Sequence, residues 1–135
     1  MNRMNNIVKT GLVCICLLLW AACSKDTDDK LQGRWQIQQV ENDGNVQKVD
    51  TFFYNFQTSL FQYQYYRPQS DSFASRYGYN TLTGENELEL ELEADHNFLQ
   101  YTDWTSNKRV FTIEEVSGSQ LILSSEGKRY TFRKF

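Results

Sequence analysis

The chain has 135 residues, with 14 Lys and Arg against 17 Asp and Glu, which gives a formal net charge of −3. This length provides a hydrophobic core for one domain and is too short for two. A modestly acidic chain lacks the positive surface that binds phosphate backbones, so its composition excludes nucleic acid as a partner.

Residues 1–22 have the composition of a secretory signal peptide. Arg3 and Lys9 form its positive start, and an apolar run follows from Gly11 to Trp20. This run is shorter than the roughly 20 apolar residues that cross a hydrocarbon core. We therefore expect residues 1–22 to direct secretion and to be removed.

The end of this segment resembles the lipobox of bacterial lipoproteins. Ala21 and Ala22 are small, Cys23 follows directly, and Trp20 replaces the leucine that is usual at that position. The resemblance implies cleavage before Cys23 and acylation of its thiol, with palmitate as the kind of chain attached, and hence a membrane partner. Two buried acyl chains hold a protein on a bilayer. The alternative is an ordinary secretory signal with a chance cysteine.

Loss of the signal changes charge and cysteine content. Residues 23–135 retain 12 Lys and Arg against 17 Asp and Glu, a net charge of −5. Cys14 and Cys16 are lost, so we expect no disulfide in the mature domain and stability from packing alone.

Residues 23–31 hold the lipidated cysteine and a polar stretch that predicts a flexible tether. Lys25, followed by Asp26, Asp28 and Asp29, resembles the export signal of Bacteroidetes surface lipoproteins. The resemblance implies a surface-exposed protein of the outer membrane, with a periplasm-facing protein as the alternative.

Residues 32–135 alternate apolar and polar side chains with period two, which predicts strands. The expected strands are 33–41, 48–56, 60–66, 73–81, 87–93, 108–116, a segment containing Leu121 and Leu123, and 128–135. Asp43-Gly44 predicts a tight hairpin turn. Short links exclude parallel crossovers, and eight antiparallel strands in sequence order predict an all-β, up-and-down barrel.

Two segments resemble the lipocalin superfamily, in particular the small lipocalin-like lipoproteins of Bacteroidetes. Gly33-Arg34-Trp35 matches the Gly-x-Trp signature, and residues 121–134 resemble the last hairpin of that family. The resemblance implies that Trp35 plugs the closed end of the barrel. It also implies that Arg133 or Lys134 covers the indole as a cation–π partner.

Aromatic residues in strands 48–56, 60–66 and 73–81 suggest a ligand pocket. Tyrosine is an unusual choice for a dry core, because each buried hydroxyl needs a partner. The alternative is that these rings simply fill the barrel. The candidate pocket residues are Tyr54, Phe56, Tyr63, Tyr65, Tyr77 and Tyr79.

The loop from Asp95 to Asn107 suggests a second surface. Tyr101 and Trp104 belong to residue types that are enriched at interaction hot spots. At the open rim they would contact an envelope protein or a glycan, or fold back over the barrel.

Sequence motifs for catalysis and metal binding are lacking. His96 is the only histidine, and the chain has no nucleophile elbow and no phosphate-binding glycine loop. Glu87, Glu89, Glu91 and Glu93 share one strand face, which predicts a solvated surface. We therefore expect no catalytic residue, no metal site and no cofactor.

The sequence predicts a non-catalytic lipoprotein that binds a small hydrophobic or amphipathic ligand inside its barrel. The alternative is a filled barrel that docks to an envelope protein or glycan through its loops. The size of the cavity distinguishes these two hypotheses.

Overall fold

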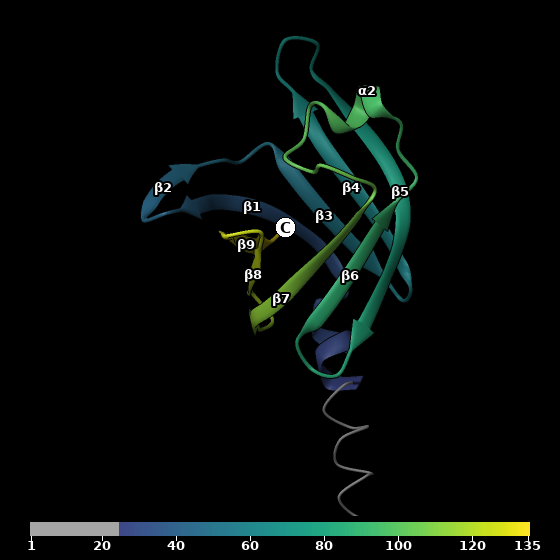
Figure 1. Cartoon of the computed structure of the whole chain (residues 1–135), viewed down its shortest axis with the longest axis vertical. Helices are drawn as coiled ribbons and strands as arrows, with labels where there is room; N and C mark the ends of the chain where they lie inside the picture. The colour runs from purple at the N-terminus through teal and green to yellow at the C-terminus, as the bar shows by residue number, and fades with distance from the viewer. Residues whose placement is uncertain (1–24) are drawn as a thin grey trace, which may run out of the picture.

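The structure is a computed structural model that describes residues 25–135, so the predicted signal peptide and Cys23 lie outside the described residues. After a short helix at residues 25–31, the elements follow in chain order (Figure 1). They are β1 (Gly33–Asn42), β2 (Asn45–Lys48), β3 (Phe52–Gln57), β4 (Leu60–Arg67), β5 (Ser72–Thr83), β6 (Glu87–Leu92), α2 (His96–Leu99), β7 (Lys108–Val116), β8 (Gln120–Ser125) and β9 (Lys128–Lys134).

Eight of the strands close into an antiparallel barrel, which confirms the predicted fold. β1 and β3 to β9 pair in sequence order, and β9 then pairs with β1. Closure leaves no long unpaired edge in these strands. The ninth strand, β2, lies outside the ring and pairs only with the far half of β1.

The predicted strand at 48–56 is divided in two. Asp43 and Gly44 have φ angles of 52° and 81°, the geometry of a tight hairpin turn, so β2 folds back on β1. The chain then crosses to β3, which pairs with the first half of β1. The outer half of β1 thus pairs with β2 on one side and with β9 on the other (Figure 1).

The tether differs from its prediction, because residues 25–31 are helical and pack below the barrel (Figure 1). Leu31 is fully buried, and its carbonyl oxygen accepts a hydrogen bond of 2.8 Å from Trp35 Nε1. Lys30 and Asp26 form an ion pair one helical turn apart, at 3.0 Å. The described part of this segment is therefore a folded extension of the barrel. Its composition is polar, and the burial of Leu31 against the barrel is a tertiary contact that composition does not predict.

Strand β5 faces the opposite way from its prediction. Tyr77 and Tyr79 point outward, with 66% and 50% of their surfaces exposed, whereas Gly78 and Asn80 are buried. A Cβ on Gly78 would lie 1.7 Å from the Glu91 carbonyl oxygen, so β5 and β6 approach closely there. Large rings from β3 and β4 fill the interior, so little space remains for a side chain that points inward from β5 at Gly78.

Candidate ligand-binding site

The barrel interior is filled by aromatic side chains, and Trp104 lies among them. Its indole stacks on Phe61 with the ring centroids 6.1 Å apart and 8° between the planes. Its Nε1 donates a 3.0 Å hydrogen bond to the Tyr54 hydroxyl. Only 4% of Trp104 is exposed, so it does not offer an interacting ring at the rim, and its burial agrees with the alternative that the loop folds back over the barrel. Trp104 occupies the space that the sequence prediction assigned to a ligand.

The six predicted pocket residues do not form one pocket. Tyr54, Phe56 and Tyr63 are buried inside the barrel, and Tyr65 is half-buried. Tyr77 and Tyr79 lie on the outer surface, where the prediction that they face inward is wrong. Burial raises the pKa of Tyr54 and of Tyr63 well above the usual tyrosine value, so both hydroxyls remain neutral at physiological pH.

Tyr101 lies at the rim, on the loop that carries Trp104. Its ring packs against Tyr65 with the centroids 6.0 Å apart, and 62% of the residue is exposed. The structure therefore separates the two predicted rim residues, with Tyr101 outside and Trp104 within the barrel.

A buried polar network, absent from the sequence predictions, holds this loop in place. Arg109 is 3% exposed and lies 3.2 Å from an Asp103 carboxylate oxygen. Its Nη2 donates to the Tyr130 hydroxyl at 2.7 Å, its Nε donates to Ser125 at 3.1 Å, and Tyr130 in turn donates to Asp103. Burial, and then the hydrogen bond to Asp103, raises the pKa of Tyr130. The network connects the 93–107 loop to β7, β8 and β9.

The sequence pattern around Arg109 indicates that its side chain points into the barrel. It shares the strand parity of Phe111 and Ile113, which are buried, and its guanidinium carbon lies 4.8 Å from the Phe111 ring centroid. A charged residue in the inward phase of a strand needs a buried partner. Asp103 supplies that partner from a loop, so periodicity does not identify it.

At the opposite end of the barrel, Trp35 is fully buried. Lys134 Nζ lies 4.4 Å from the Trp35 ring centroid and also donates to the Gln32 carbonyl oxygen. Arg133 instead donates to Gln36 at 2.9 Å, so only Lys134 takes the covering position. Burial lowers the pKa of Lys134. Gly33 has a φ of 118°, and a Cβ there would lie 2.6 Å from Lys134 Nζ, which explains the glycine of the Gly-x-Trp signature.

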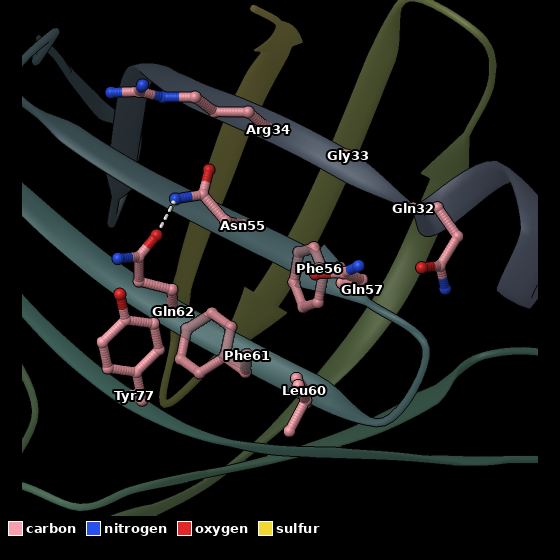
Figure 2. A pocket seen from close by; sticks show the side chains of 10 residues that line it. All are labelled: Gln32, Gly33, Arg34, Asn55, Phe56, Gln57, Leu60, Phe61, Gln62 and Tyr77. Carbon is pink, nitrogen blue, oxygen red and sulfur yellow. Dashed lines mark hydrogen bonds between the residues drawn. The ribbon is translucent and has the colours of Figure 1, made fainter.

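A groove of about 460 Å³ lies on the outer face of strands β1, β3, β4 and β5 (Figure 2). Four residues cross it as one row in the sheet, because Arg34 pairs with Asn55, Asn55 with Gln62, and Gln62 with Tyr77. Strand spacing of roughly 4.8 Å makes this row about 14 Å long. The row thus offers, in order, a cation, two amides and an aromatic ring.

The remaining lining of the groove is both apolar and polar. Leu60 is half exposed and Gln57 adds another amide, while Phe56 and Phe61 border the groove but are almost fully buried. Among residues 25–135, Arg34 is the one charged side chain that lines the groove. An amphipathic molecule of modest size suits such a surface.

An aromatic cluster lies next to the groove and holds the Arg34 guanidinium. Its carbon atom lies 4.3 Å from the Phe53 ring centroid, 5.0 Å from that of Phe135 and 5.4 Å from that of Phe73. These contacts draw the charged end of Arg34 toward the rings, while its backbone pairs with that of Asn55 on the neighbouring strand.

The four glutamates follow the predicted alternation, with Leu88, Leu90 and Leu92 buried between them. Glu89 lies 3.6 Å from Lys108 on the next strand. Within residues 25–135, no three His, Cys, Asp or Glu side chains are grouped so that they could hold a metal ion. No helix in this part of the chain is long and apolar enough to cross a bilayer.

Taken together, a closed eight-stranded antiparallel barrel with a tryptophan-plugged end defines a lipocalin-type protein. The family model for the lipocalin-like domain matches residues 16–135, and the chain belongs to this family. A lipocalin-like protein from Bacteroides uniformis ATCC 8492 is 34% identical, with a TM-score of 0.71 over 78% of this chain and 99% of that one. An uncharacterized protein from Bacteroides eggerthii DSM 20697 is 29% identical, with a TM-score of 0.70 over the same shares. No curated protein matches the chain.

Proposed function

We propose that this protein is a non-catalytic binding protein of the cell envelope that takes a small amphipathic molecule in its outer groove. The lipocalin-like fold supports small-ligand binding. The observation that carries the proposal is the groove, which combines the exposed ring of Tyr77 with the amides of Asn55 and Gln62. Inside the barrel, Trp104 packs among the aromatic rings and takes up the space that a ligand would need.

Energetics favour the groove over the interior. A ligand in the barrel must displace Trp104, and removing a buried tryptophan side chain costs about 3–5 kcal/mol. The ligand must also replace the indole as hydrogen-bond partner of the Tyr54 hydroxyl, because Trp104 Nε1 donates to that hydroxyl. A ligand in the outer groove carries neither cost.

The envelope location rests on the lipobox-like sequence before Cys23 and the acidic residues after it. Lipid on Cys23 would hold the protein on the outer membrane, exposed at the cell surface. The described helical residues 25–31 connect the Cys23 side of the chain to the Trp35 end of the barrel, which would place this end toward the bilayer. The 93–107 loop would then face away from it.

The test is native mass spectrometry of residues 24–135 after incubation with a small-molecule extract of the host envelope. We expect a bound small molecule in the unaltered domain and its loss in Tyr77→Ala. Tyr101→Ala is the matched control, because this tyrosine is equally exposed and lies outside the groove. A domain that stays free of ligand, or that loses its ligand only in Trp104→Ala, would contradict the proposal.

A second candidate function is docking to an envelope protein. The filled interior and the exposed rings of Phe73 and Phe135 favour it. Cross-linking in intact cells separates the two functions. Docking predicts a protein adduct that Phe73→Ser weakens, whereas small-ligand binding predicts no dependence on Phe73.

A further inference from the structure

We infer that the ligand of the outer groove is a saccharide, bound along the row from Arg34 to Tyr77. This inference rests on the proposed function and specifies the chemical class of the ligand. It depends on two features of the described residues in and beside the row: hydrogen-bonding atoms that lack partners, and exposed tyrosine rings that take part in no ring–ring contact.

The hydrogen-bonding atoms belong to Arg34 and Asn55. Asn55 Nδ2 donates to Gln62 at 2.7 Å and to Gln64 at 3.1 Å, and Gln64 donates to Ser75 at 3.0 Å. This ladder of amides fixes the orientation of the Asn55 side chain and occupies both hydrogen atoms of its Nδ2. Its Oδ1 is buried and, within the described part of the chain, accepts no hydrogen bond.

Arg34 supplies the complementary atom on the next strand. Its Nε is also buried and donates no hydrogen bond to any described residue. Arg34 and Asn55 are direct partners in the sheet, and such partners have Cβ atoms about 5 Å apart. An unpaired donor and an unpaired acceptor therefore belong to neighbouring residues of the row, and a buried polar atom without a partner is unfavourable.

A hydroxyl group satisfies both atoms, because it accepts one hydrogen bond and donates another. Both side chains line the groove and are only half-buried, so binding requires that a side-chain rotation turns these atoms toward the ligand. A water molecule also bridges a donor and an acceptor, but it makes no use of the apolar surface beside them.

That apolar surface comes from Tyr77, Tyr79 and Leu60, which are all half or more exposed. Tyr77 and Tyr79 take part in none of the ring–ring contacts between the described residues, so their faces are free to stack. A sugar ring presents C–H groups on its faces and hydroxyls around its edge. It therefore matches a ring beside an amide ladder, whereas an alkyl chain leaves the Arg34 and Asn55 atoms unpaired.

The experiment is an NMR titration of residues 24–135, which contain every strand of the closed barrel. The probes are cellobiose, maltose, chitobiose and digalacturonate, with decanoate as a simple amphiphile. We expect at least one disaccharide to shift the side-chain amide signals of Asn55 and Gln62. Tyr77→Ala should weaken that binding at least tenfold, Tyr77→Phe should retain it, and Tyr101→Ala should leave it within twofold.

The outcomes separate the two levels of the proposal. If decanoate alone shifts the groove signals, the saccharide inference is overturned and the proposed function stands. If no probe shifts them, both are overturned. Saccharide binding that is insensitive to Tyr77→Ala also overturns the inference, because the sugar is then held elsewhere.

Discussion

The tyrosines show how one residue type serves two purposes in this molecule. Inside the barrel, Tyr54 and Tyr130 use their hydroxyls to hold Trp104 and Arg109. On the outer face, Tyr77 and Tyr79 expose their rings to solvent. The buried tyrosines stabilise the fold, because each hydroxyl with a partner fixes a neighbouring side chain. The exposed pair contributes little to stability.

The buried tyrosines predict loss of stability at alkaline pH. Burial raises the pKa of Tyr54, Tyr63 and Tyr130, so these groups stay protonated in the folded state while they ionise in the unfolded chain above pH 10.0. Their contribution is complete below pH 10 and decreases as the pH rises toward their folded-state pKa values. Each such tyrosine lowers the free energy of unfolding by about 1.4 kcal/mol per pH unit in that window.

Urea unfolding between pH 8 and 11.5 measures this effect. Lys134 acts in the opposite direction up to about pH 10.5, because burial lowers its pKa. We expect Tyr63→Phe to make the decline less steep than in the unaltered protein. An equal slope in the two proteins would contradict a raised pKa for Tyr63.

At the scale of elements, the 93–107 loop and strand β5 determine what the barrel contains. Asp95 accepts a 2.9 Å hydrogen bond from the Phe98 amide and begins α2, and the following residues carry Trp104 into the interior. Strand β5 complements this insertion, because its inward positions include Ala74 and Gly78 rather than rings. The loop thus fills the barrel with an indole, and the small side chains of β5 leave room for it.

Trp104→Ala tests the contribution of the loop. We expect it to lower the free energy of unfolding by about 3–5 kcal/mol, because it removes a buried indole that stacks on Phe61. Thermal unfolding followed by circular dichroism measures the change. Tyr101→Ala, on the exposed side of the same loop, should stay within about 0.5 kcal/mol. An unchanged melting temperature for Trp104→Ala would place the indole outside the core.

Gly78→Ala tests the close approach of β5 and β6. Its Cβ would lie 1.7 Å from a backbone oxygen, which a side-chain rotation cannot relieve, so we expect strong destabilisation or loss of folding. Gly118→Ala is the matched control, since a Cβ there meets no atom within 4 Å and its φ is not positive. Comparable stability of the two variants would contradict the packing of β5 against β6.

At the scale of the whole molecule, the two ends of the barrel have different roles. One end is closed by Leu31, Trp35 and Lys134, next to the chain that leads back to Cys23. The other is closed by the loop that Asp103 and Arg109 hold in place. The proposed binding groove lies on the side wall between these ends, so neither closure must open for a ligand to enter.

Cys23→Ala tests the anchor independently of the fold. All strands and the helix at 25–31 follow Cys23, so we expect the variant to leave the membrane fraction while its melting temperature stays the same. Fractionation of host cells by ultracentrifugation provides the measurement. Retention of the variant in washed membranes would contradict lipid attachment at Cys23.

Much of the fold could be predicted from the sequence, because its determinants are local. Alternation with period two marks the strands, and Asp43-Gly44 marks a turn that only small or flexible residues adopt. In β6 the leucines and glutamates also define the inner and outer faces. Eight such strands joined by short links therefore predict an antiparallel up-and-down barrel.

The candidate site depended on tertiary structure. In β5 both faces carry apolar residues, so the alternation predicts a strand but not whether Tyr77 points inward or outward. The register of β5 with β4 and β6 determines that direction. Trp104 enters the barrel, and Asp103 meets Arg109, through a loop with no periodicity. The groove row takes one residue from each of four strands, and such a row exists only once the strands are paired. Local sequence determined the elements of this protein, and long-range pairing determined which side chains meet.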